Sequence, residues 1–219
     1  GVAILVRPNL APLALVLAAI PFIQHDTRER QLRGLAAMMA GSLPGMLALL
    51  WLNRALYGSA FGSGYGALAD LFSPGHVSAN ASNYARAMFQ TQHVVPLFAL
   101  LAPLVFDGVR RKGSLLLLAF AGSVAATYLL YSPFPEWWYL RFLIPAIVVL
   151  LILASATGVR LLSKASMGGL IPIAAVVLGI IASRAARERD AFELHRMEGR
   201  YREAANIVRE RLPENAVVI

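Results

Sequence analysis

The sequence predicts an all-α protein, a polytopic bundle of transmembrane helices with an outer-side loop and an amphipathic C-terminal helix. Three observations support this fold class. Of the 219 residues, 58% are hydrophobic, and the mean hydropathy is +0.62. Charged residues make up 15% of the chain, against roughly 25% in a typical soluble domain. These charges are concentrated in short segments between long apolar runs and in the residues after position 183.

The composition also excludes several classes of site. The chain has no cysteine, which excludes disulfides and thiolate metal ligands. The histidines are scattered and no phosphate-binding loop or hydrolase motif is present, so no metal site is predicted and the cofactor stays open. The net charge of +8 is explained by the position of the loops rather than by nucleic-acid binding. Of the 20 basic residues only Lys112 and Lys164 are lysines, a bias typical of a GC-rich bacterial genome.

Transmembrane helices are the first elements to place. A helix that crosses the hydrocarbon core needs about 20 mostly apolar residues. About five to six segments approach this length, and they lie at residues 10–23, 35–52, 87–106, 115–131, 142–156 and 170–182. The third is the least continuous, because Pro96 and Pro103 interrupt it. Prolines are tolerated in membrane helices, and small residues such as Gly41 and Gly122 allow helices to approach closely.

The orientation of the bundle follows from the basic residues in short loops. Alternate connections hold eight of them, namely Arg28, Arg30, Arg33, Arg110, Arg111, Lys112, Arg160 and Lys164. The opposite connections hold only Arg54, Arg86 and Arg141. The first set is therefore predicted to be cytoplasmic. Residues 53–93, residues 132–140 and the C-terminal tail are then on the periplasmic side of an inner membrane.

Two outer segments have predicted structure of their own. Residues 53–93 are too long for a simple turn, and residues 67–72 are expected to form a short interfacial helix. A glycosylation-type triplet begins at Asn80 in this segment, and we interpret it as a chance match.

The tail forms the second predicted domain, residues 184–219, after a transmembrane module at residues 1–183. Apolar residues recur in it at helical spacing, namely Leu194, Met197, Tyr201, Ala204 or Ala205, Val208 and Leu212. Pro213 then ends the run. This pattern predicts an amphipathic helix that leads into a periplasmic domain.

The stretch YSPFPEWWYLRFLIPA contains the most informative polar residue, Arg141. One interpretation is an interfacial anchor, in which neighbouring aromatic rings lie at the headgroup level and the guanidinium reaches water. The other is binding of a lipid-linked phosphate, which a guanidinium holds through two hydrogen bonds. Arg7 raises the same alternatives at the start of the first span. Asp70 and Glu136 are the outer carboxylates before the tail, and each stands alone in the sequence.

Four stretches, LVRPNLAPLALVL, LNRALYGSAFGSGY, NYARAM and WWYLRFLIPAI, occur in this order. The succession resembles the C-terminal half of bacterial GT-C type membrane glycosyltransferases, the relatives of protein mannosyltransferases and aminoarabinose transferases. The resemblance implies inverting transfer of a sugar from a polyprenyl-phosphate donor to an acceptor on the outer face. It also implies that an acidic base lies in a module upstream of Gly1, so no catalytic residue is assigned. An outer cavity near Arg7, Tyr57, Tyr65 and Arg141 is implied to bind the lipid phosphate and the donor sugar.

Two further functional classes stay open. A polyprenyl-lipid flippase or transporter would place charged residues or broken helices near mid-membrane, and the sequence shows no such site. A surface-polysaccharide polymerase or ligase would place its catalytic residues in a large outer loop, for which residues 53–93 are the candidate. The chain is expected to be a fragment of a longer protein, and as part of a glycosyltransferase it is expected to be inactive alone because the catalytic half is missing.

Overall fold

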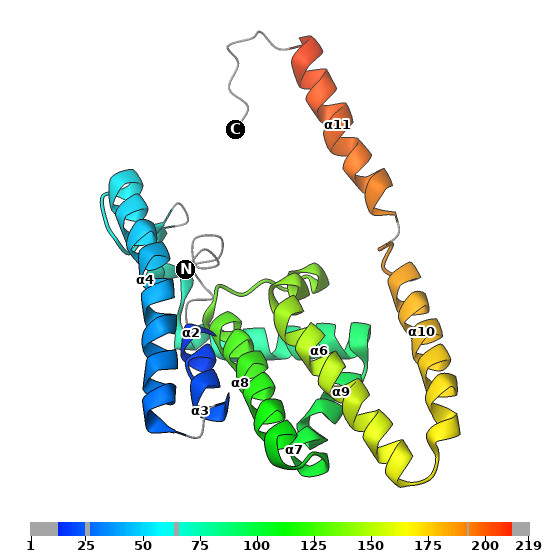
Figure 1. Ribbon diagram of the computed structural model, residues 1–219. Coiled ribbons are helices and arrows are strands. Elements are labelled where there is room, and N and C mark those ends of the chain that lie inside the picture. The colour runs from blue at the N-terminus through cyan, green and yellow to red at the C-terminus, as the bar shows by residue number, and fades with distance from the viewer. Residues whose placement is uncertain (1–12, 25–26, 64–65, 192, 212–219) are drawn as a thin grey trace. The chain divides into compact units, whose positions relative to one another are not determined.

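The computed structural model describes residues 13–24, 27–63, 66–191 and 193–211. The chain forms two compact units, residues 1–168 and residues 169–219. Almost all of the described elements are helices (Figure 1), which confirms the predicted all-α fold class.

The first unit contains most of the helices. Its α-helices are α2 (Leu13–Leu17), α3 (Ile20–Gln24), α4 (Arg28–Tyr57), α5 (Leu68–Leu71), α6 (Val77–Gln92), α7 (Ala102–Val105), α8 (Gly108–Leu130) and α9 (Ile144–Lys164). Its 3-10 segments are η2 (Pro74–His76), η3 (Val95–Leu101) and η4 (Trp137–Leu143). Two strands of two residues each, β1 (Gly62–Ser63) and β2 (Gly66–Ala67), pair in antiparallel orientation. The short turn η5 (Gly168–Leu170) precedes α10 (Ile171–Arg187), and α11 (Leu194–Arg211) follows it.

Four helical segments in the described ranges are long and apolar enough to cross a membrane, at Arg28–Tyr57, Gly108–Leu130, Trp137–Lys164 and Gly168–Arg187. They contain four of the predicted spans. The first predicted span, residues 10–23, begins outside the described residues and continues as the short apolar helix Leu13–Gln24. The lengths and compositions of these helices indicate a multi-pass membrane protein.

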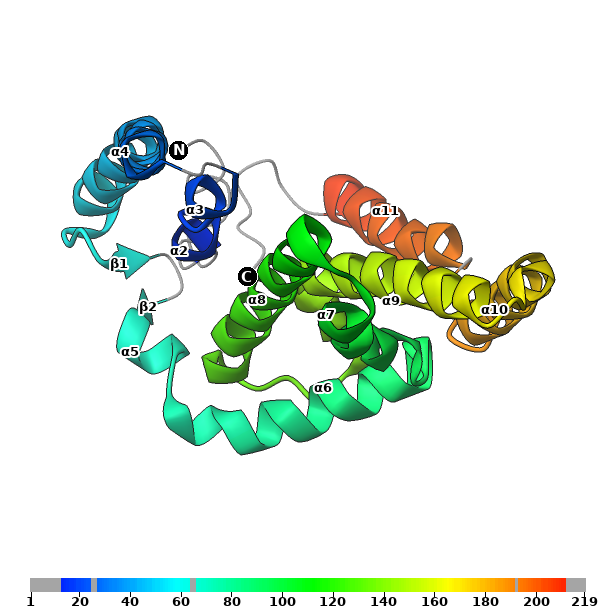
Figure 2. The same cartoon turned by 60° about the horizontal axis from the view of Figure 1, so that its bottom comes forward.

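The predicted single span at residues 87–106 is wrong in shape. The chain bends by 103° between the helical segment Pro74–Gln92 and the segment Val95–Val105. Figure 1 shows α6 crossing behind α8 and α9, and Figure 2 shows the chain turning back from α6 toward α7. The bend occurs at His93, whose φ of 53° leaves the helical region, and Pro96, the second residue of the next segment, has no backbone N–H.

The segment 53–93, which was predicted to be an outer loop, is also more helical than expected. Helix α4 continues to Tyr57 and ends where Gly58 takes a left-handed conformation, with φ of 74°. The predicted short helix at residues 67–72 is confirmed as α5. Most of the remaining segment forms α6, whose Ser and Asn residues are more typical of loops.

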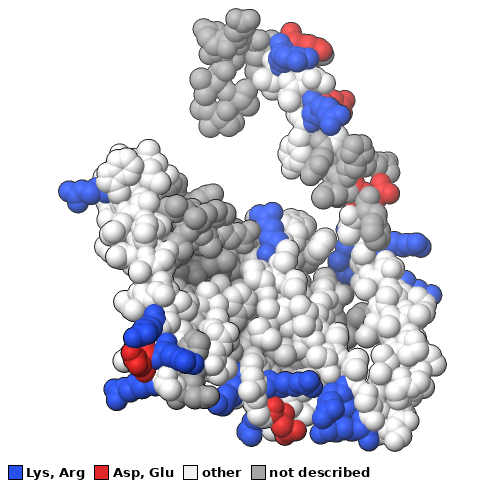
Figure 3. Space-filling view, viewed as in Figure 1, with Lys and Arg blue, Asp and Glu red and all other residues white. Residues whose placement is uncertain are grey.

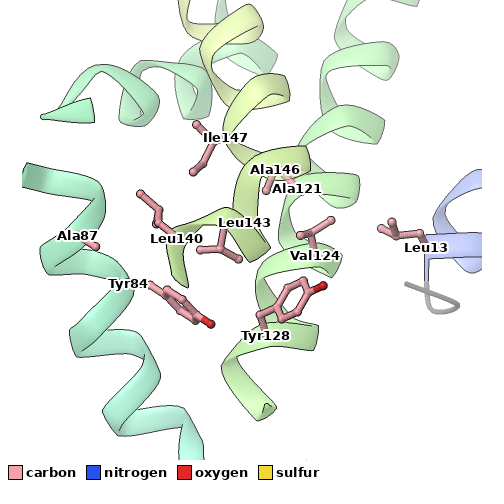
Figure 4. Packing of buried hydrophobic residues seen from close by; sticks show 10 residues of the cluster. All are labelled: Leu13, Tyr84, Ala87, Ala121, Val124, Tyr128, Leu140, Leu143, Ala146 and Ile147. Atoms are coloured by element: carbon pink, nitrogen blue, oxygen red, sulfur yellow. The ribbon is translucent and has the colours of Figure 1, made fainter. Parts of the chain in front are cut away.

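Two buried clusters hold the first unit together. The larger one joins α6, α8, η4 and α9, with Val124 and Tyr128 almost completely buried at its centre (Figure 4). The smaller one packs Ala99 and Ala102, which follow the bend, against Leu153 and Ala154 of α9. The bent segment is therefore fixed by close contact with α9.

Basic residues gather at one end of the first unit. Helices α4 and α8 begin at this end and α9 finishes there (Figure 1). Lys and Arg side chains line the same end in Figure 3. The predicted grouping of the three basic connections on a common side agrees with this arrangement. Which side of the membrane it faces stays a prediction.

Two glycines of α4 provide a test of the packing between α3 and α4. A Cβ atom at Gly34 would lie 2.8 Å from Cβ of the buried Pro21 on α3, whereas a Cβ at Gly41 would meet no described atom within 4 Å. We expect Gly34→Ala to lower the free energy of unfolding by about 1–2 kcal/mol, because the proline ring cannot move aside. Gly41→Ala should be neutral or stabilising by up to about 1 kcal/mol, because alanine favours helix. Thermal unfolding in detergent measures both, and equal shifts would contradict the close approach.

Candidate functional site

The candidate site lies at the end of the first unit where α8 finishes and η4 begins. Helix α8 runs from the basic end at Gly108 to Leu130, and residues 131–136 then lead into η4. The last carbonyl groups of any helix have no partner within the helix and must find one elsewhere. In this protein the partners come from Ser73, from η2 and from α6.

Asn80 provides most of these partners. Its Nδ2 atom lies 3.2 Å from the carbonyl oxygen of Tyr128, 3.1 Å from that of Leu129 and 2.5 Å from that of Tyr131. All three are acceptors, so the amide must present its N–H₂ group to them. The side chain is completely buried, and its Oδ1 atom has no hydrogen-bond partner among the described residues. The burial agrees with the interpretation of the glycosylation-type triplet as a chance match.

Further hydrogen bonds fasten the same segments together. The backbone N–H of Ser73 donates to the carbonyl of Leu130 at 2.8 Å, and Nδ1 of His76 lies 3.2 Å from that oxygen. Asn83 donates from Nδ2 to the carbonyl of Phe134 at 3.3 Å. Helix α6 thus forms hydrogen bonds with Tyr131 and Phe134 in the connection between α8 and η4.

Aromatic rings of this connection and of the neighbouring helical segments pack against one another. Phe134 stacks on Tyr139 with ring centroids 4.1 Å apart, and Tyr128 stacks on Phe142 with centroids 5.1 Å apart. Tyr131 meets Phe142 edge-on at 5.9 Å. Such stacked and edge-on pairs stabilise a fixed ring arrangement beyond the area they bury.

Arg141 contacts two of these aromatic rings. Its guanidinium carbon is 5.3 Å from the ring centroid of Tyr139 and 5.5 Å from that of Phe142, within the range of cation–π attraction. The side chain is exposed, and within the described ranges the one ion pair is between Arg33 and Glu29. The charge of Arg141 is therefore oriented by aromatic rings and remains available to an anion from outside the chain.

Two tryptophans extend the exposed surface of η4. Trp137 and Trp138 contact each other edge-on, and Trp138 is 49% exposed. Exposed tryptophans at the end of an apolar helix are typical of the membrane–water interface. The site thus combines exposed aromatic rings with one cation that two of the rings orient.

The other predicted site residues lie elsewhere or outside the described ranges. Tyr57 is the last residue of α4, half exposed, on a helix that packs against α3 and β1, whereas η4 packs against α6, α8 and α9. Arg7 and Tyr65 are not among the described residues. Asp70 and Glu136 are both exposed. The described residues contain no group of three ligands that would hold a metal ion.

The burial of two polar residues of α6 was not predicted from the sequence, where Asn80 was noted only as part of a chance triplet. Asn80 and Tyr84 are one helical turn apart, and both are buried among apolar neighbours. The Tyr84 ring points from α6 toward Tyr128 (Figure 4), and its hydroxyl has no partner among the described residues. The available signal was their four-residue spacing, which places two polar side chains on the buried face of an otherwise alanine-rich helix.

No protein-family model, no curated protein and no solved structure matches this chain. The chemistry of the site and the order of the four sequence stretches are therefore the grounds for proposing a function.

Proposed function

We propose that this chain is part of an integral membrane glycosyltransferase, which moves a sugar from a polyprenyl-phosphate donor to an acceptor at the outer face. The observation that carries the proposal is the position of Arg141, exposed and oriented by Tyr139 and Phe142. Trp137 and Trp138 beside it fit an interfacial location. A guanidinium at this depth suits a phosphate that is attached to a membrane-embedded lipid.

The proposed reaction makes one bond and breaks one bond. An acceptor oxygen attacks C1 of the sugar, the bond from C1 to the phosphate oxygen breaks, and the polyprenyl phosphate leaves with the electron pair. The acceptor proton passes to an acidic base, which we place in the module upstream of Gly1. Arg141 would stabilise the negative charge that develops on the leaving phosphate. Arg7, Tyr57 and Tyr65 are proposed to line the rest of the donor cavity.

The Arg141→Ala variant tests this role. We expect sugar transfer to fall about 100-fold or more, because a positioned donor is lost where charge develops, while the amount of protein inserted in the membrane stays near the wild-type level. Transfer is measured in membranes that express the whole reading frame containing this sequence, with a radiolabelled polyprenyl-phosphate sugar. Arg86→Ala is the matched control, since Arg86 is an exposed arginine of α6. If the Arg141 variant loses activity and insertion equally, the residue is an anchor only.

One observation favours a second candidate function, a polyprenyl-lipid flippase or transporter. Broken helices are common at the binding sites of transporters, and the 103° bend between the segments Pro74–Gln92 and Val95–Val105 is such a break. The sequence indicated only that Pro96 and Pro103 interrupt this span. The two functions differ in what happens to the sugar.

Reconstituted vesicles separate the two candidates. A transferase needs an acceptor and releases the polyprenyl phosphate, whereas a flippase moves the intact lipid-linked sugar to the other leaflet without an acceptor. Movement of the intact donor together with absence of transfer would overturn the glycosyltransferase proposal.

A further inference from the structure

The basic end of the first unit is the strongest charged surface that the proposed function does not use. Its members are the eight residues of the three basic connections, Arg28, Arg30, Arg33, Arg110, Arg111, Lys112, Arg160 and Lys164, and all eight are exposed. The acidic residues near these connections in the sequence are Asp26, Glu29 and Asp107, of which Asp26 lies outside the described residues. Within the described part of the chain Arg33 pairs with Glu29, and the other seven have no carboxylate within ion-pair distance.

The fold brings these residues together from distant parts of the sequence. Helices α8 and α9 pack against each other, and α8 begins at the end of the unit where α9 finishes (Figure 1). The start of α8 carries Arg110, Arg111 and Lys112, and the end of α9 carries Arg160 and Lys164. Figure 3 shows basic side chains along this whole end of the unit. The result is one cationic rim made by three helices.

Apolar side chains are exposed directly beside this rim. Leu104 of α7 is 78% exposed and Val109 of α8 is 75% exposed, and Val159 and Leu161 are exposed on the last turns of α9. A soluble anion such as a nucleotide would bind the cations but would leave these apolar groups uncovered. A phospholipid has a phosphate at the level of the cations and acyl chains at the level of the apolar residues.

We propose that this basic rim binds the headgroups of anionic phospholipids in the adjacent leaflet, with the acyl chains lying against the exposed apolar residues of α7, α8 and α9. Guanidinium groups bind phosphate through paired hydrogen bonds, and clusters of basic residues next to membrane helices attract anionic lipids. The proposal is independent of the function of the aromatic site at the other end of α8.

Thermal unfolding of the purified chain in mixed micelles tests the proposal. Phosphatidylglycerol should raise the Tm by about 5 °C or more at saturation relative to equal amounts of phosphatidylcholine, as expected for a ligand far above its Kd. The difference should vanish near 1 M salt, where charges are screened beyond about 3 Å. Glycerol phosphate at the same concentration should give no comparable shift, because it has no acyl chains.

A pair of triple variants locates the effect. Replacing Arg110, Arg111 and Lys112 with Gln should remove at least half of the shift that phosphatidylglycerol causes. Replacing Arg200, Arg202 and Arg209 of α11 with Gln removes the same number of charges outside the rim and should leave the shift unchanged.

Three results would overturn the proposal. The first is equal Tm values in the two lipids, which needs only the wild-type chain and so applies even if the rim variant fails to fold. The second is an equal loss in both triple variants, which would indicate a response to net charge. The third is an equal shift with glycerol phosphate, which would indicate a site for soluble anions.

Discussion

An Asn80→Asp variant is expected to lose about 3 kcal/mol or more of stability. The substitution keeps the size of the side chain but replaces the N–H₂ group that faces the carbonyl oxygens of Tyr128, Leu129 and Tyr131. A carboxylate would place negative charge against three acceptors in a fully buried position. A shift of this size lowers the Tm by about 6 °C or more. Thermal unfolding of the purified chain in detergent measures it.

An apolar variant separates the lost hydrogen bonds from the added charge. Asn80→Leu leaves the same carbonyl groups without a donor but adds no charge, so we expect a loss of about 2 kcal/mol, smaller than that of Asn80→Asp. Tyr84→Phe is the matched control, because it removes a buried polar atom from the same face of α6 without removing a described hydrogen bond. That variant should be neutral or slightly stabilising. If Tyr84→Phe is as destabilising as Asn80→Leu, the loss of stability is not specific to Asn80. Capping of α8 would then not explain it.

Much of the fold was predictable because the membrane imposes simple rules on the sequence. Helices α8, α9 and α10 are long apolar runs, and a helix of about 20 such residues has few alternatives in a bilayer. The common side of the basic connections followed from their alternation along the chain. These features depend on the local composition of each segment, which can be determined from a single sequence.

The part of α6 before residue 87 was missed because its stability comes from distant residues. Ser, Asn and Thr have low helix propensity and favour turns, so the segment resembled a loop. Asn80 and Asn83, however, form hydrogen bonds with carbonyl groups some fifty positions further along the chain. Such partners have no signal in the sequence of α6 itself. The same reason explains why the bend after α6 could be placed only once its packing against α9 was known.

Some residues of the candidate site were likewise predictable from the sequence and others were not. Arg141 was predictable, because a single arginine within an apolar, aromatic run is costly and therefore conspicuous. Its two ring partners, Tyr139 and Phe142, are close in sequence and share the turn η4. Tyr57 was grouped with Arg141 by resemblance, and the structure places it on a helix that packs against α3 and β1.

An Ala102→Leu variant is the second substitution with a large expected effect. Ala102 is completely buried at the start of α7, where it packs with Ala99 against Leu153 and Ala154 of α9. Three additional carbon atoms cannot be accommodated there unless the bent segment moves away from α9. We expect a loss of about 3 kcal/mol, at the upper end of the usual cost of overpacking, because Ala102 is completely buried in this cluster.

Leu104→Ala is the control for this prediction, since Leu104 lies on the same short helix and is 78% exposed. In detergent its truncation should change the Tm by about 1 °C or less, because surface substitutions have small effects. Leu153→Ala should recover part of the stability that Ala102→Leu loses, because it returns volume to the same cluster, and a double-mutant cycle measures this coupling. If Ala102→Leu and Leu104→Ala have equal effects, or if Leu153→Ala adds to the loss without coupling, the segment after the bend does not pack against α9 as described.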